Sequence, residues 1–280
     1  MQEKKLIYVF NIDENINYMN DILKHPMYML NIKCLKQYAK KFNKALIIIT
    51  VTNHESKTEI IENVKILFND IFTNIEIKIE ENDKVDREAK YFHKYIIQEL
   101  GNIKEQIFFA HTKGLSRWNT NLNCSIWVAA MYYFNLEYID NVNYVAGFPF
   151  DYYKTNKTIY NINFYIKEPY MFSGTFYWLN PKNINKYIKE SGKKFILDYM
   201  NNEKCPLRFR MLAENFPLYT IPMGVAETIN KENILEKTKD KYILFEFYEH
   251  DGILKYIKEF YPEYVNKFID FYNNLIAQLK

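Results

Sequence analysis

Four consecutive residues combine side chains suited to chemistry with a backbone that can turn: His111, Thr112, Lys113 and Gly114. An imidazole can donate a hydrogen bond, act as a base or bind a metal, and a lysine ammonium suits a phosphate. Gly114 permits a tight turn and lets a ligand approach the backbone. Short motifs of this kind also occur in ordinary loops, where the lysine is solvated. The motif directly follows the apolar run 107–110, and this strand-end position favours an anion site.

A second charged group, residues 82–88, contains Arg87 at the start of a predicted helix. A helix N-terminus attracts anions through its free N–H groups and its dipole. Arg87 could bind a diphosphate there with two parallel hydrogen bonds. The alternative is a plain N-cap by Asp83 or Asp86 with a solvated Arg87.

Two further groups lie in the second half of the chain. In the run 172–178 (Phe-Ser-Gly-Thr-Phe-Tyr-Trp), glycine removes a side chain where another group must come close. The flanking hydroxyls could bond a sugar and the aromatic rings could stack on it, the alternative being a core strand with a bulge. Arg210 and Glu214 are four residues apart and share a helical face. They form either a surface ion pair or a general base, Glu214, held by Arg210.

The elements that position these groups follow from the apolar pattern of the first 115 residues. Strand-length runs occupy residues 6–10, 45–51, 75–79 and 107–110. Helical periodicity occupies residues 27–42, 56–68 and 87–100, with a capping-box spacing at Ser56 and Glu59. This alternation predicts an α/β fold with a mostly parallel sheet, whose ligand lies beyond the carboxyl ends of the strands.

Shorter elements are predicted after residue 125. A helix is expected at 126–138, strands at 144–148, 159–166 and 170–179, and helical turns at 183–190 and 211–216. The tail 262–280 has an apolar face that predicts an amphipathic terminal helix. We expect it to pack against its own domain, with a membrane surface as the alternative.

Composition limits the function classes. A net charge of +3 over 280 residues gives no electrostatic case for a nucleic-acid partner. Three distant cysteines, Cys34, Cys124 and Cys205, exclude a disulfide framework and fit a reducing compartment. The short N-terminal apolar run is typical of a first strand rather than a signal peptide. We therefore expect a cytoplasmic protein, with peripheral association at the inner face of the membrane left open by the tail.

The order of these motifs resembles that of bacterial and viral glycosyltransferases of the GT-A type, related to enzymes of rhamnan and capsular polysaccharide synthesis. The resemblance covers about residues 5–220 and includes an aromatic helix with Trp127 and Met-Tyr-Tyr-Phe at 131–134. It implies a Rossmann-like nucleotide-diphospho-sugar transferase fold. Residues 1–225 would be the catalytic domain, divided into a nucleotide-sugar half (1–115) and an acceptor half (116–225), and 226–280 a C-terminal helical appendage.

The resemblance also implies roles for the candidate residues. Donor-binding residues would be Phe10, Asn11, Thr52, Arg87, His111, Lys113 and Gly114. Acceptor-binding residues would be Trp127, Ser173, Gly174, Trp178 and Arg210. The catalytic residues would be Glu214, as the base that deprotonates the acceptor hydroxyl, and His111. Inverting and retaining outcomes both stay open.

One departure from related enzymes concerns the metal. The sequence has no Asp-x-Asp, the pair of carboxylates that would hold a divalent cation beside the leaving diphosphate. Lys113, His111 and Arg87 could supply positive charge instead, so we predict no metal cofactor, with Mg²⁺ or Mn²⁺ left open.

The predicted function is transfer of a sugar from a nucleotide-diphospho-sugar to a glycan or lipid-linked glycan acceptor, in capsule or lipopolysaccharide synthesis. A non-catalytic nucleotide- or carbohydrate-binding protein on the same scaffold is the alternative. A nucleotidyltransferase has less support because the chain lacks a Gly-rich P-loop.

Overall fold

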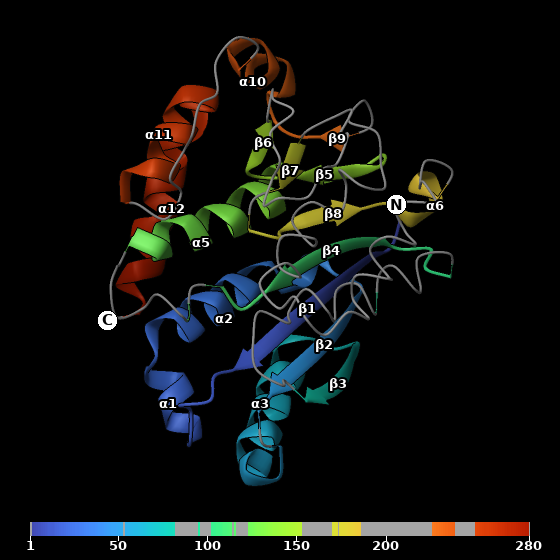
Figure 1. The fold of residues 1–280 in the computed structure, drawn as a ribbon, viewed down its shortest axis with the longest axis vertical. Coiled ribbons are helices and arrows are strands. Elements are labelled where there is room, and N and C mark those ends of the chain that lie inside the picture. Colours follow the sequence, from blue (N-terminus) through green and yellow to red (C-terminus); the bar gives the residue numbers. More distant parts are fainter. Residues whose placement is uncertain are drawn as a thin grey trace, which may run out of the picture.

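A central sheet organises the computed structural model (Figure 1), which describes residues 2–52, 54–81, 95, 102–113, 115, 123–152, 170–172, 174–185, 226–238 and 250–279. Its seven strands lie in the order β3-β2-β1-β4-β8-β5-β9. Their bounds are β1 Lys4–Ile12, β2 Lys44–Val51, β3 Ile75–Glu81, β4 Gln106–His111, β5 Val145–Gly147, β8 Tyr177–Leu179 and β9 Ala226–Glu227. A second, antiparallel sheet pairs β6 (Phe150–Tyr152) with β7 (Tyr170–Phe172).

The first four strands are parallel to one another, which confirms the predicted α/β class. β8 is antiparallel to both β4 and β5, and β9 is parallel to β5, so the whole sheet is mixed but mostly parallel. The register pairs Val9 with His111 and Asn11 with Thr50. The strands that carry the predicted nucleotide residues therefore end at one common edge, as expected.

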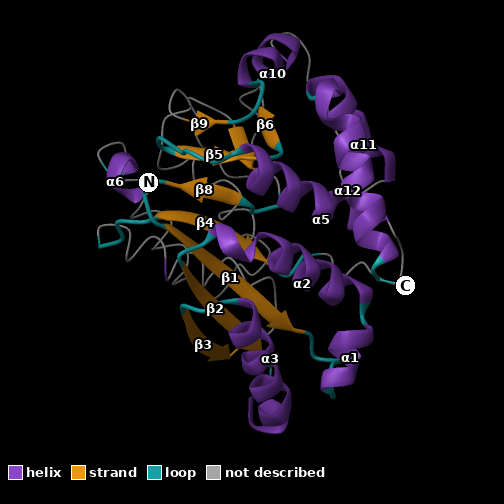
Figure 2. Cartoon of the chain, turned by 180° about the vertical axis from the view of Figure 1, so that it is seen from behind, coloured by secondary structure: helices purple, strands orange, loops and turns teal. Residues whose placement is uncertain are grey.

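Several helices cover one face of this sheet. They include α1 (Met19–Lys24), α2 (Pro26–Tyr38), α3 (Thr58–Ile71) and α5 (Asn123–Tyr133), the last continued by a π-helical turn, η5, at Phe134–Tyr138. Phe10 of β1 packs against Tyr28 of α2 and Phe68 of α3, which places both helices on the same side. Figure 2 shows α2, α3 and α5 together on the near side of the strands.

The terminal helices extend this layer. α11 (His250–Phe260) and α12 (Val265–Ala277) both pack on α5, and α12 also contacts α2 (Figure 1). Phe268 of α12 is fully buried. The prediction that the tail packs against its own domain is therefore confirmed. No helix in the described ranges is long and apolar enough to cross a bilayer.

The remaining short elements connect these layers. They are α6 (Pro181–Ile184), α10 (Lys231–Thr238) and the 3₁₀ turns η1 (Ala39–Lys41), η2 (His54–Lys57) and η8 (Pro262–Tyr264). The predicted helix 183–190 thus begins two residues early, where Pro181 occupies the first helical position. The predicted elements at 87–100, 159–166 and 211–216 lie outside the described residues, except Tyr95.

Three sequence predictions differ from the structure. The capping box at Ser56 is wrong, because η2 precedes the helix and makes Lys57 the N-cap of α3, with no side-chain cap. The single strand predicted at 170–179 is wrong, because positive φ values at Gly174 and Thr175 turn the chain between β7 and β8. The predicted helical appendage begins with a strand of the sheet, β9.

Candidate functional site

The ends of β1, β2 and β4 meet at one side of the sheet, which we call the carboxyl edge: Asn11, Thr52 and residues 111–113. Thr112 fixes the exit of β4 against β1. Its backbone N–H donates to Val9 O at 2.9 Å, and its Oγ1 accepts from the Asn11 N–H at 3.3 Å. Tyr8 also donates to Oγ1 from the core, at 3.3 Å. The start of the predicted motif is therefore a rigid extension of the sheet.

The exit of β1 is held equally firmly. Thr50 Oγ1 donates to Asn11 Oδ1 at 2.9 Å, and the Tyr28 hydroxyl donates to Asn11 O at 2.7 Å. The same hydroxyl accepts from the Asp13 N–H at 2.9 Å. Asn11 and Thr52 are half-buried, so both lie where a ligand at the edge would meet them. Phe10 is fully buried, and its ring belongs to the core instead.

Lys57 closes the loop that follows β1. Its ammonium donates to Asp13 O and Glu14 O, both at 2.9 Å. Burial lowers the pKa of Lys57, while the nearby carboxylates of Asp13 and Glu14 act in the opposite direction. The loop beside the carboxyl edge thus has a defined shape and a local positive charge.

His111 links the end of β4 to the turn before β8. Its Nε2 lies 3.1 Å from Gly174 O. Gly174 has φ +89°, and a Cβ built on it would lie 2.4 Å from Met131 Sδ and 3.1 Å from Trp127 Cζ2. A side chain would clash there. The sequence predicts glycine at this position because another group comes close, and the structure shows that this group is α5.

Lys113 lies above the ring of Trp127. Its Nζ is 4.6 Å from the ring centroid, within the range of a cation–π interaction. Both side chains are nearly buried, with exposed fractions of 3% for Lys113 and 1% for Trp127. Trp127 therefore supports the lysine from beneath rather than forming an open acceptor surface.

Three of the predicted motifs are thus brought together: the strand end, the aromatic helix and the glycine turn. Asn31, which the sequence analysis missed, joins them through α2. Its Nδ2 donates to Lys113 O at 3.1 Å and its Oδ1 accepts from the Lys113 N–H at 3.4 Å. An asparagine on the otherwise apolar buried face of α2 is the sequence signal that could have revealed it.

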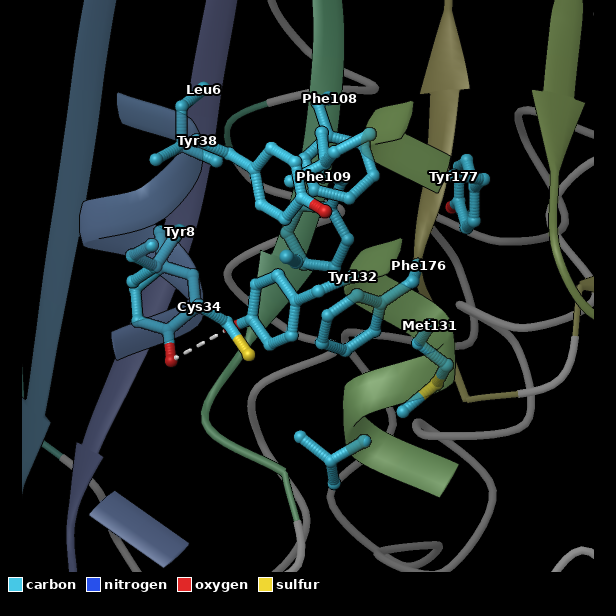
Figure 3. Packing of buried hydrophobic residues seen from close by; sticks show 14 of the residues in the cluster. Leu6, Tyr8, Cys34, Tyr38, Phe108, Phe109, Met131, Tyr132, Phe176 and Tyr177 are labelled. Carbon is cyan, nitrogen blue, oxygen red and sulfur yellow. Dashed lines mark hydrogen bonds between the residues drawn. The ribbon is translucent and has the colours of Figure 1, made fainter. Parts of the chain in front are cut away.

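A buried chain of hydroxyls extends from Asn31 toward β1. Tyr132 donates to Asn31 Oδ1 at 3.1 Å and contacts the Tyr8 hydroxyl at 3.4 Å. Figure 3 shows Tyr8 and Tyr132 facing each other across the core, with Phe176 and Met131 beside them. Burial is the main cause that raises the pKa of Tyr132 well above its ordinary value, which keeps its hydroxyl protonated as a donor.

Trp178 is placed apart from this group. Its Nε1–H donates to Asn135 O at 2.8 Å, and its ring packs 5.0 Å from Phe108. Only 1% of its surface is exposed. This packing offers no free ring face to a sugar, so the acceptor role predicted for Trp178 does not fit its position. Arg87, Gly114, Ser173, Arg210 and Glu214 lie outside the described residues.

A separate surface groove of about 720 Å³ lies between α2 and α12. It is lined by Met29, Ile32, Lys33, Lys36, Gln37, Phe271, Asn274, Leu275 and Gln278. None of these residues belongs to the carboxyl edge. In the described part of the chain, His, Cys, Asp and Glu side chains form no group of three that could hold a metal ion.

The carboxyl edge offers a cation, an imidazole and backbone groups held in fixed positions. No family model and no curated protein matches this chain. A functional proposal therefore has to be drawn from the side chains of the carboxyl edge and their chemistry. A cation that is shielded from water attracts an anion more strongly than an exposed one. The arrangement suits a ligand with negative charge close to Lys113.

Proposed function

We propose that this chain is a glycosyltransferase of the GT-A type, which moves a sugar from a nucleotide-diphospho-sugar to a hydroxyl of a glycan or lipid-linked glycan acceptor. Synthesis of a surface polysaccharide is the proposed setting. The observation that carries the proposal is the placement of Lys113 and His111 at the carboxyl ends of parallel strands, where α/β proteins bind nucleotides.

The donor would lie across the carboxyl edge. Its nucleoside would meet Asn11 and Thr52, which are half-buried there. Its diphosphate would meet Lys113, whose ammonium is buried in the ligand-free protein and would have to become accessible when the donor binds. As the bond between the sugar and the diphosphate breaks, negative charge grows on the leaving phosphate. A fixed ammonium stabilises that charge without reorganisation, which lowers the barrier. Arg87 is proposed as a second cation on the diphosphate.

The acceptor hydroxyl would attack the anomeric carbon while Glu214 removes its proton. His111 is oriented by Gly174 O, at 3.1 Å, so its ring is fixed beside the proposed phosphate position. Because Trp127 and Trp178 are enclosed by protein, acceptor contacts are proposed for Ser173 and Arg210 instead. The carbon would be inverted by direct displacement.

A binding screen tests the donor half of this proposal. Thermal unfolding is measured with UDP, GDP, ADP, CDP and dTDP, and with their sugar derivatives, because a ligand of the native state raises stability. We expect one nucleoside diphosphate family to stabilise the protein. K113M should weaken the binding of that nucleoside diphosphate roughly 10- to 100-fold, the scale of a hydrogen bond to a charged group. K36M, at an exposed lysine of α2, is the matched control.

A turnover assay tests the catalytic half. Release of nucleoside diphosphate is followed with candidate glycan acceptors present and absent. E214Q should keep donor binding and lose about 10²- to 10⁴-fold in turnover, the usual contribution of a general base. Donor binding without any transfer or hydrolysis in the wild-type protein would instead support a non-catalytic nucleotide-binding protein.

A further inference from the structure

Asn31 uses all of its hydrogen-bonding capacity at one point of the fold. The side chain is fully buried in the middle of α2. Its Nδ2 donates to Met27 O at 2.7 Å and to Lys113 O at 3.1 Å. Its Oδ1 accepts from the Lys113 N–H at 3.4 Å and from Tyr132 at 3.1 Å. A primary amide has two donor hydrogens and two acceptor sites, so nothing is left over.

These contacts fix the backbone of one residue in two directions. Lys113 comes two residues after the end of β4, where the sheet no longer holds the chain. Asn31 replaces the missing strand partner, because it pairs with both the N–H and the C=O of Lys113. The direction of the lysine side chain depends on that backbone. A rotation there would move Nζ away from its place above Trp127.

We propose that Asn31 is a positioning residue, which holds the backbone of Lys113 so that its ammonium is directed at the diphosphate of the donor. The link to the donor depends on the proposed function; the link to Lys113 depends only on the contacts described. Asn31 acts through Lys113 and does not itself touch the substrate.

The same chain contains a matched control. Asn135 in η5 is also fully buried, and its Nδ2 donates to the carbonyl four residues earlier, Met131 O, at 2.7 Å. It pairs with both backbone groups of Phe148, at 2.9 Å for the carbonyl and 3.1 Å for the N–H. Asn135 thus forms the same kind of bridge at the end of β5, and not at Lys113. N31A and N135A should cost similar amounts of stability.

The first measurement is hydrogen exchange in the full-length protein without ligand. N31A should accelerate exchange in the peptide that contains residues 106–113, more than in the peptide that contains 145–150. N135A should give the opposite pattern. Y132F removes only one bond to Asn31 and should give a smaller change of the N31A kind, which keeps the test open if N31A does not fold. Equal exchange changes in both peptides for N31A and Y132F would overturn the positioning role.

The second measurement is binding of inorganic pyrophosphate, UDP, GDP and ADP by calorimetry. N31A should weaken binding about tenfold, a scale typical of a misplaced contact group, while N135A stays close to wild type. Equal affinity in N31A and wild type would overturn the link to the donor. If none of these probes binds the wild-type protein but the exchange pattern is as expected, the donor site fails and the positioning of Lys113 by Asn31 stands.

Discussion

At the scale of single residues, the structure assigns different tasks to side chains that look alike in the sequence. Trp127 and Trp178 are both buried and each lies beneath a lysine, but Trp127 contacts Lys113 at the carboxyl edge, whereas Trp178 contacts Lys4 and donates to Asn135 O. His111 is tied to Gly174, a residue 63 positions further along the chain. Such pairings depend on tertiary contacts, so spacing in the sequence could not predict them.

Gly174 gives the first prediction. G174A should lower the free energy of unfolding by about 1–3 kcal/mol, because φ +89° strains a residue with a Cβ and the new methyl group meets Met131 and Trp127. It should also weaken pyrophosphate binding, since Trp127 supports Lys113. Urea denaturation and calorimetry measure the two effects.

G147A is the control for this variant. Its Cβ would lie 2.5 Å from the Phe172 ring, so it is also overpacked, but its three nearest atoms all belong to Phe172 rather than to α5. We expect G147A to lose stability and keep pyrophosphate affinity. A G174A protein with wild-type stability and affinity would show that the turn tolerates a side chain.

The use of cations in place of a metal gives the second prediction. Transfer or donor hydrolysis should continue after exhaustive treatment with a chelator, because the sequence lacks the Asp-x-Asp carboxylates. The assay measures release of nucleoside diphosphate before and after chelation. Complete loss of activity that Mg²⁺ or Mn²⁺ restores would contradict a metal-independent reaction.

At the scale of elements, the first half of the fold could be predicted and the second half only in part. The run at 45–51 is continuous, apolar and rich in isoleucine, so it indicated a buried parallel strand, and β2 occupies Lys44–Val51. The start of α3 could not be predicted, because a 3₁₀ turn shifts the N-cap to Lys57 and leaves Ser56 outside. The break at Gly174 required knowledge of the side chains on α5.

The candidate site was predictable to a similar degree. The strand-end position of His111 and Lys113 followed from the strand pattern. The role of Asn31 could not be predicted in this way. Helical periodicity is recognised from the spacing of apolar residues, so a single polar residue on the buried face carries no signal of its own in that pattern. Its partners, Lys113 and Tyr132, are 82 and 101 positions away. Only the fold shows that this residue joins the site.

The N-cap of α2 gives the third prediction, a dependence of stability on pH. The Met27 N–H donates to His25 Nδ1 at 3.3 Å, so the cap requires that nitrogen to be unprotonated. Burial lowers the pKa of His25 below its ordinary 6.5, although the Asp13 carboxylate opposes the shift. The contribution of the cap is therefore complete above the unfolded pKa and is lost as pH falls through the lower folded pKa.

Urea denaturation at about pH 8 and about pH 5 measures this effect. The wild-type protein should lose about 1 kcal/mol more than H25N between these values, since asparagine caps a helix without titrating there. Equal losses in the two proteins would show that protonation of His25 leaves the cap intact.

At the scale of the whole molecule, the terminal helices complete the layer that supports the site. α12 packs on α5, which carries Trp127, and on α2, which carries Asn31. Phe268 is its most buried contact and lies 5.6 Å from both Tyr133 and Phe134, measured between ring centroids. α12 thus packs against the two helices that carry Trp127 and Asn31, the residues that contact Lys113.

Phe268 gives the fourth prediction. F268A should lower the free energy of unfolding by about 3–5 kcal/mol, the usual cost of removing a buried phenyl ring. N273A, at an exposed position of the same helix, should change it by less than about 0.5 kcal/mol. Guanidinium denaturation measures both. If F268A and N273A change the free energy of unfolding by the same amount, α12 does not contribute to the cooperative core.

The outermost of the described strands of the main sheet also bear on how copies of this protein would associate. β3 is one outer strand, and it carries Glu76, Lys78, Glu80 and Glu81 among its isoleucines. Lys78 forms an ion pair with Glu76 at 3.2 Å, so charged side chains of both signs lie along this strand. The opposite outer strand, β9, comprises Ala226 and Glu227 among the residues that the structure describes. Charges along an outer strand discourage pairing with a sheet of another molecule, so we expect β3 to resist β-type pairing between copies in concentrated solution.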